Sequence, residues 1–340
     1  MKKKKALVWS LIGFIILVLI GVGLFFFLNR DTHKYDEEES VKQEEKQEVK
    51  DDSATPLLYK VTKDDSNTVI YLFGSIHMAD DRAYPLRKEI MFAYYSSTYL
   101  AVEFDTIAYQ KDMSKMVNDA KGMMYLDGTK LKDHLDEDSY NKIVNYLKEN
   151  NSYSSLYEMY KPVMFYSLVN VTIGNKSGLD EKKGIDNYFL EDAHEHNKNI
   201  LGVESSDYQF GLFTKYSDKL FEILTLYMIE NEEDGVQELK DLYEGWLKGD
   251  PTEIISETGE EVPEEVIKKY GDSIKELKKF NKELVDERNE NMIKVVDGYF
   301  KENKDTFVVV GAAHIVGDKG IAKGLEKLGY KVEIVQYKNS

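Results

Sequence analysis

From Pro56 onward, short apolar runs alternate with longer stretches in which apolar residues recur at helical spacing. PLLYKVT (56–62) and NTVIYLFG (67–74) are rich in β-branched and aromatic residues and flank the polar KDDS, which predicts a hairpin. Further apolar runs predict strands at 98–105, 200–205, 306–314 and 331–337.

The stretches between these strands predict helices. Helical spacing is present in YPLRKEIMFAYYSS (84–97), where Pro85 suits a first turn, in 107–176, in 184–199, in 208–300 with a loop near 249–265, and in 317–330. Because strands alternate with helices, the sequence predicts an α/β fold. We expect a central mixed sheet with parallel pairs, flanked by helices.

The first 29 residues differ from the rest of the chain. Lys2–Lys5 precede 23 uncharged residues, Ala6–Leu28. A helix of that length covers about 34 Å, enough to cross a hydrocarbon core of about 30 Å. We predict an uncleaved transmembrane anchor over residues 1–29; a cleaved signal peptide is the alternative, although the run is long and lacks a small-residue cleavage site.

The next segment has the composition of a linker. Residues 31–55 hold ten acidic residues and four lysines with few apolar side chains, which predicts a disordered linker over 30–55. Residues 56–340 then form one globular domain. Because lysine clusters stay in the cytoplasm, we expect a single-pass protein of the cell membrane with this domain outside the cell.

Charge and cysteine content exclude several functions. A net charge of -17 disfavours nucleic acid as a partner, since binding to phosphates requires a basic face. The chain has no cysteine, which excludes disulfides, thiolate metal ligands and a cysteine nucleophile.

Two segments far apart in the chain repeat one pattern. YLFGSIHMAD (71–80) and VVVGAAHIVGD (308–318) each contain an apolar strand, a glycine, two small or apolar residues and a histidine, which are His77 and His314. The strands at 98–105 and 200–205 each carry a valine-glutamate pair, with Glu103 and Glu204. Two pseudo-symmetric halves would explain this repetition.

These residue types suit a metal site. Functional groups in open α/β sheets gather at the carboxyl ends of strands. Imidazole binds zinc, manganese, cobalt or iron, and carboxylates add oxygen ligands, so the set predicts an open hydrolytic metal site. The alternative is that both histidines are hydrogen-bonded structural residues. We expect the remaining histidines, His33, His134, His194 and His196, to be solvated.

The segments YLFGSIHMAD, AVEFD, GIDNYFLEDAHEHNKNILGVESSDYQ, LVDERNENM and TFVVVGAAHIVGDKGIAKGLEKLGYKVEIV occur in an order that resembles the TraB/GumN family. That family includes the pheromone-shutdown proteins and the animal Tiki proteases. The resemblance covers about residues 56–338. It implies a fold like that of Tiki and the erythromycin esterases. It also implies a divalent metal ion such as Mn, Co or Zn, held by His77, His314 and Glu103, and hydrolysis of a peptide or protein substrate.

Other residues near the expected metal site are assigned supporting roles. Arg288 and Asn289 match an arginine-asparagine pair of the family; Arg288 could hold a substrate carboxylate or an oxyanion, or it could neutralise the glutamates of the site. Asp186 and Glu204 are candidates to orient the histidines. Glu103 is the expected general base, with Glu204 as the alternative. Ser75 and Tyr188 are weaker candidates, better explained by packing or local hydrogen bonds.

Three functions follow from these observations. The first is a membrane-anchored, extracellular, metal-dependent hydrolase, in particular a peptidase. The second is an esterase-like hydrolase in which His77 or His314 is the base and no metal is needed. The third is a surface module that binds a peptide or a metal-bearing ligand without turnover.

Overall fold

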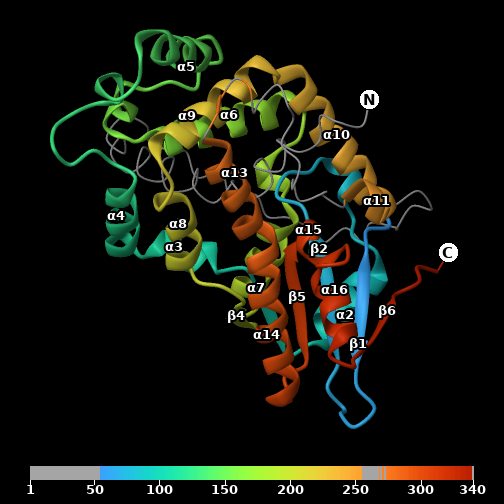
Figure 1. The fold of residues 1–340 in the computed structure, drawn as a ribbon. Helices are drawn as coiled ribbons and strands as arrows, with labels where there is room; N and C mark the ends of the chain where they lie inside the picture. Colours follow the sequence, from blue (N-terminus) through green and yellow to red (C-terminus); the bar gives the residue numbers. More distant parts are fainter. Residues whose placement is uncertain (1–53, 255–267, 269, 272, 339–340) are drawn as a thin grey trace.

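The computed structural model describes residues 54–254, 268, 270, 271 and 273–338. Within them, six strands form one sheet in the order β4-β3-β5-β2-β1-β6 (Figure 1). The strands β4 (Asn199–Gly202), β3 (Tyr99–Val102), β5 (Thr306–Gly311) and β2 (Ile70–Ser75) are parallel. β1 (Leu58–Thr62) pairs antiparallel with β2 and with β6 (Lys331–Ile334). The predicted mixed α/β sheet and the β1-β2 hairpin are confirmed.

Helices cover both faces of the sheet, which explains the near-continuous apolar strands. On one face, α2 (Lys88–Ser96), α7 (Ile185–Glu195) and α10 (Glu232–Lys248) pack on Phe73 and Phe307. On the other face, α14 (Arg288–Lys301) and α16 (Ile321–Lys327) pack on Val308 and Val310. Alternate residues of β5 therefore point to opposite cores, as the period of a strand requires.

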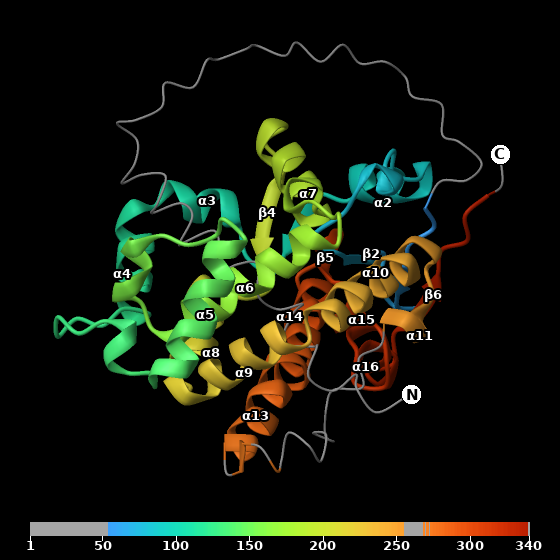
Figure 2. The same cartoon turned by 90° about the horizontal axis from the view of Figure 1, so that it is seen from above.

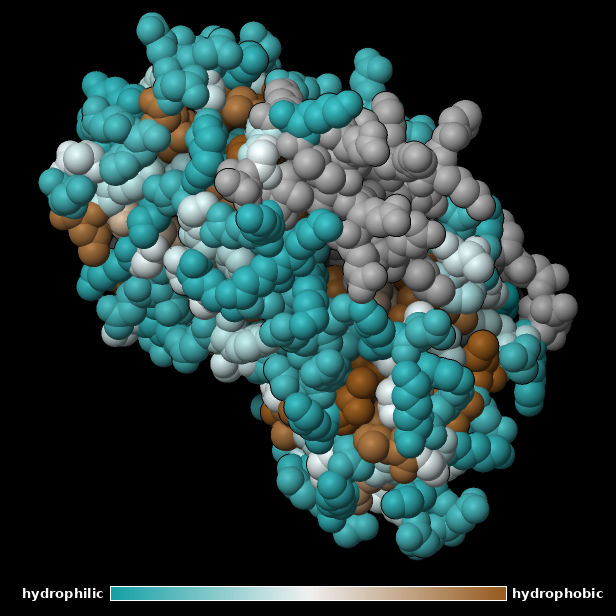
Figure 3. Space-filling model, in the orientation of Figure 1, coloured by the Kyte–Doolittle hydropathy of each residue, from teal (hydrophilic) through white to brown (hydrophobic). Residues whose placement is uncertain are grey.

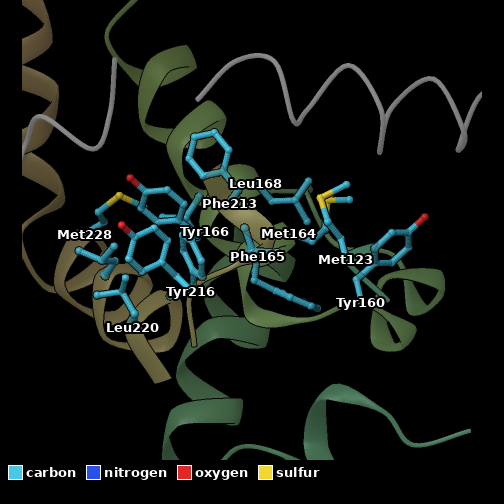
Figure 4. Packing of buried hydrophobic residues seen from close by; sticks show 14 of the residues in the cluster. Met123, Tyr160, Met164, Phe165, Tyr166, Leu168, Phe213, Tyr216, Leu220 and Met228 are labelled. Carbon is cyan, nitrogen blue, oxygen red and sulfur yellow. The ribbon is translucent and has the colours of Figure 1, made fainter. Parts of the chain in front are cut away.

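A second, helical core lies on the side of the sheet toward which β5 runs into α15 (Ala312–Ile315) (Figure 1). Its centre is α6 (Pro162–Lys176), which is buried on nearly every side and packs against α9 (Asp218–Glu230). Figure 4 shows Phe165 and Tyr166 of α6 among Phe213, Leu220 and other apolar side chains. The remaining α-helices of the described residues are α3 (Thr106–Lys111), α4 (Met113–Gly122), α5 (Glu137–Glu149), α8 (Ser206–Thr214), α11 (Pro251–Ile254) and α13 (Ser273–Lys282).

Two local expectations need correction. The apolar run at 306–314 is not one strand: β5 ends at Gly311, and His314 lies in the short helix α15. Pro85 is not in the first turn of a helix, because α2 begins at Lys88 after Arg87, whose backbone is extended. At the end of β5, Ala312 of α15 packs closely against Gly74 of β2, a long-range contact that a periodic pattern does not record.

The face of the molecule drawn in Figure 3 is mostly polar. In the view of Figure 3, apolar side chains are scattered among hydrophilic ones outside the residues drawn in grey. None of the described helices is both long and apolar enough to cross a bilayer. The predicted anchor (1–29), nearly all of the predicted linker (30–55) and much of the predicted loop near 249–265 lie outside the described residues.

Candidate functional site

Four neighbouring parallel strands end at one edge of the sheet. His77 follows β2, His314 follows β5, Glu103 follows β3 and Glu204 follows β4. Because parallel strands place their carboxyl ends together, the topology brings these four residues to the same edge. Glu103 and each of the two histidines shift one another's pKa values through charge interactions, and His77 also shifts that of His314, as expected of groups that lie close together.

Gly74 allows the two glycine-x-x-histidine segments to pack against each other. A Cβ atom at this position would lie 2.9 Å from both Cα and Cβ of Ala312. The Gly74 carbonyl also accepts a hydrogen bond of 2.8 Å from the indole N–H of Trp246 in α10. The glycine is thus explained by close approach of two strand ends, and Trp246 fixes the turn that leads to His77.

A buried ionic cluster occupies the β3-β4 side of this edge. The guanidinium of Arg288 donates to Glu103 Oε2 at 2.5 Å and to Glu204 Oε2 at 2.7 Å, and the side chain of Arg288 is 3 % exposed. The Gln209 amide donates to the same two carboxylates at 2.9 and 2.8 Å. Glu103 Oε1 accepts a bond of 3.1 Å from the N–H of Gly311. The sequence allows two roles for Arg288: binding of a substrate group, or neutralisation of the glutamates of the site. Its contacts in the structure agree with the second role.

This cluster keeps Glu103 ionised. Burial opposes its charge, but the attraction of Arg288, together with smaller contributions from both histidines and the N–H of Gly311, outweighs burial and holds the pKa of Glu103 well below its usual range. The same carboxylates raise the pKa of Arg288. Arg288 begins α14 directly after a π-helical turn, Glu283–Glu287. Such turns are frequent at functional sites.

His314 is held as a neutral imidazole. Its Nδ1 lies 2.6 Å from Asn289 Oδ1, so Nδ1 carries the proton and donates it. Asn289 is itself fixed, because its amide donates to the Lys319 carbonyl at 3.1 Å. Burial and the charge of Arg288 lower the pKa of His314 to about 3. The lone pair of this ring therefore lies on Nε2.

His77 is tethered in a similar way but to a carboxylate. Its Nδ1 lies 2.8 Å from Asp186 Oδ2 in α7, and the other Asp186 oxygen accepts a bond of 2.7 Å from Ser75. Burial disfavours protonation of His77, but Asp186 and Glu103 outweigh it and raise its pKa to about 9. The predicted role of Asp186 as the partner of a histidine agrees with this contact. Among the described residues, none forms a hydrogen bond with Nε2 of His77 or of His314.

Gly184 supports the loop that carries His77. A Cβ atom on Gly184 would lie 2.3 Å from the His77 carbonyl oxygen. The next residue, Ile185, donates its N–H to the Ile76 carbonyl at 3.0 Å. The start of α7 and the loop after β2 therefore fit together only without a side chain at residue 184.

The donor set can be tested against the implied divalent ion. Two imidazoles tethered through Nδ1, beside an ionised carboxylate, fit such an ion in chemistry, provided that the ion displaces the proton that the raised pKa of His77 keeps on Nε2 at neutral pH. Within the described residues, however, no group of three or more histidine, aspartate or glutamate side chains is placed so that it could hold a metal ion. Glu103 Oε2 is not free to bind an ion in this arrangement, because it already accepts hydrogen bonds from Arg288 and Gln209.

The other candidates occupy different positions. The hydrogen bonds of Glu204 go to Arg288 and Gln209 rather than to a histidine. The hydroxyl of Tyr188 meets Met91 Sδ at 3.9 Å, consistent with packing. The histidines outside the strand ends are His194, which is half-buried and contacts Asp105 at 2.9 Å, and the exposed His134 and His196, while His33 lies outside the described residues.

Sequence reasoning missed Gln209 and the link from Asn289 to His314. Gln209 lies just over one turn beyond Glu204, in a helix capped by Ser205, and that spacing directs its side chain back toward the strand end. Asn289 was predicted only as part of a motif, because its contact with His314 joins residues 25 positions apart.

Comparison with known proteins supplies the family. Searches of curated proteins and of solved structures each return no significant match. The model of the TraB/PrgY/gumN family matches residues 57–334, which is most of the chain. The match covers all six strands of the sheet and every residue of the edge described above. The chain belongs to the TraB/PrgY/gumN family.

Proposed function

We propose that the protein is a metal-dependent hydrolase, in particular a peptidase, anchored in the cell membrane with its globular domain outside the cell. One observation carries the proposal: His77 and His314 are each tethered through Nδ1, to Asp186 and Asn289, and leave Nε2 without a protein partner in the part of the chain that the structure describes. Histidines that bind metals have this arrangement.

In this proposal, His77, His314 and Glu103 hold the ion. When bound, a divalent ion supplies polarisation of the scissile carbonyl and a lower pKa of bound water. Asp186 and Asn289 fix the orientation of the two rings. Arg288 keeps Glu103 ionised, and the lowered pKa of Glu103 suits a ligand better than a proton acceptor. Release of Oε2 from both Arg288 and Gln209, which retain Glu204, would complete the set of ligands.

A second candidate is a metal-independent hydrolase. It is favoured by the engagement of Glu103 with Arg288 and by the contact between His77 and Asp186, which resembles the base and orienting acid of hydrolytic triads. In that mechanism the deprotonated form of His77, which its pKa of about 9 makes a minority at neutral pH, would accept a proton from the attacking water or hydroxyl, and Asp186 would stabilise the imidazolium.

The deciding experiment is hydrolysis of a peptide library by the purified full chain in lipid nanodiscs. The assay is run after removal of metals with a chelator, and then after addition of Mn²⁺ or Co²⁺. We expect turnover only with added metal. Turnover that persists after chelation would favour the second candidate, and absence of turnover in every condition would favour a binding module. Protease added to intact cells should digest the globular domain if the predicted topology is right.

A further inference from the structure

An apolar cavity lies beside His77, and none of the residues of the ionic cluster lines it. The empty space in it and at its open mouth amounts to about 750 Å³, open solvent included. Its walls come from α6, α10, α11 and the loop that precedes α7, and Figure 2 shows α6, α10 and α15 around this part of the molecule. The lining is mainly aliphatic and aromatic: Val171, Leu179, Leu239, Leu242, Trp246 and Ile254.

Both glycine-x-x-histidine segments contribute their spacer residues to this cavity. Ser75 and Ile76 line it from the first segment, and Ala312 and Ala313 line it from the second. His77 is on its wall and also on the wall of a second, more polar cavity that contains Glu103 and Asp186. The imidazole of His77 therefore stands between an apolar cavity and the ionic side of the site.

One polar residue in the apolar wall, Asn170, has a side-chain oxygen that accepts no hydrogen bond from the described residues. Asn170 of α6 is 7 % exposed, and its amide N–H donates to the Tyr166 carbonyl at 2.9 Å. The side-chain oxygen is buried as well. A buried acceptor without a partner costs about 1–3 kcal/mol, so it is commonly retained where a ligand supplies the donor.

From this geometry we infer that the cavity binds a large apolar side chain of a peptide substrate, with an amide N–H of the peptide donating to Asn170 Oδ1. The assignment rests on the hydrolase function proposed above and narrows its substrate class. A side chain held there places the adjoining main chain at His77, next to Glu103. The amide donor favours a peptide over an ester or a hydrocarbon chain, which offer no N–H at that point.

The test measures binding separately from turnover. The full chain in lipid nanodiscs is titrated, with chelator present, with N-acetyl-Ala-Leu-Ala-amide and with the same peptide carrying Gly or Asp in place of Leu. We expect the Leu peptide to bind about 10- to 100-fold more tightly than the Gly peptide, the usual effect of burying one large apolar side chain. Equal affinity for the Leu and Gly peptides would overturn the inference, whatever the protein hydrolyses.

Two variants and one control locate the effect. Leu242→Trp fills the cavity and should abolish the preference for Leu, whereas Leu126→Trp, at a side chain that is 71 % exposed, should preserve it. Asn170→Leu removes the unpartnered oxygen at similar volume, so it should weaken binding of the Leu peptide about 5- to 10-fold without lowering the melting temperature. A purely structural asparagine would instead leave binding unchanged, and that result would overturn its assigned role.

Measuring peptide hydrolysis beside peptide binding distinguishes failure of this inference from failure of the proposed function. Hydrolysis that shows no preference for apolar residues would refute the cavity assignment and leave the hydrolase intact. Binding that prefers Leu, without hydrolysis under any metal condition, would support the cavity and refute the hydrolase.

Discussion

At the scale of single residues, Arg288 controls the charge balance of the site. It is the cation between two buried carboxylates, Glu103 and Glu204, and each carboxylate depends on it for compensation. Removal of one partner from a buried ion pair leaves an uncompensated charge, which costs far more than the pair contributes. The two sides of this cluster should therefore respond very differently to substitution.

Arg288→Met should destabilise the protein by about 3–5 kcal/mol, because two buried carboxylates then lose their cation. Glu103→Gln should cost much less, since Arg288 still pairs with Glu204 at 2.7 Å. Urea denaturation of both variants measures the difference. Equal losses of stability would mean that Arg288 does not compensate the two glutamates as a unit.

Glu103→Gln should also lower peptide hydrolysis by about 10²–10⁴-fold, a loss on the scale of one essential acid-base group or ligand. The amide keeps the shape of the side chain and removes the charge that His77 and His314 both sense. Steady-state kinetics on folded protein provide the measurement. Near-normal turnover would remove Glu103 from the mechanism and direct attention to Glu204.

At the scale of elements, the site depends on how tightly neighbouring chain segments approach one another. Gly184 at the start of α7 touches the His77 carbonyl, and Gly74 touches Ala312 at the end of β5. Neither contact needs an unusual backbone conformation. Both glycines allow two segments to pack where a methyl group would force them apart.

Gly184→Ala should destabilise the protein by about 1–3 kcal/mol and should reduce hydrolysis, because the backbone at His77 has to move. Gly211→Ala is the matched control in α8, since a Cβ atom there meets nothing within 4 Å. That control should be stabilised by about 0.5–1 kcal/mol with unchanged kinetics. Thermal unfolding and turnover of the pair test the argument; identical behaviour of the two variants would contradict it.

The elements that the sequence predicted well are those with strong local signals. The apolar runs predicted all six strands, and the strand-end positions of His77, Glu103 and Glu204 follow from them. The helix around His314 was missed because its four residues continue an apolar strand pattern. The pairing of Arg288 with Glu103 spans 185 positions, and no local pattern records which buried charges meet.

At the scale of the whole molecule, acidic side chains dominate, and their partners set the response to pH. Lys301 and Tyr330 lower the pKa of Asp297. Burial acts against ionisation of Glu283, but hydrogen bonds from Lys215 and Tyr216, together with nearby lysine charges, outweigh it and lower this pKa as well. A carboxyl whose pKa is lowered by folding stabilises the protein above its unfolded pKa, and that contribution is lost as pH falls through the folded pKa.

We therefore expect stability to fall in acid, beginning near pH 5, where unfolded carboxyls start to bind protons. Asp297→Asn lacks one such contribution, so it should be less stable than the unchanged protein at pH 7, and the difference should shrink as the pH is lowered. Asp81→Asn, at a side chain that is 91 % exposed, is the control, and its stability should differ little from that of the unchanged protein at every pH tested. Urea denaturation at pH 7, 5 and 3 measures this, and a gap for Asp297→Asn that widens in acid would reverse the assigned sign.

The central claim is that His77 and His314 hold one divalent ion between them. Its most direct test is calorimetric titration of the full chain in nanodiscs with Mn²⁺, for the unchanged protein, for His77→Ala, for His314→Ala and for the double variant. His196→Ala, at a side chain that is 62 % exposed, is the control. The account predicts one ion per chain, similar loss of binding in both single variants, and a double variant little worse than either. Unchanged Mn²⁺ binding in either single variant would contradict it.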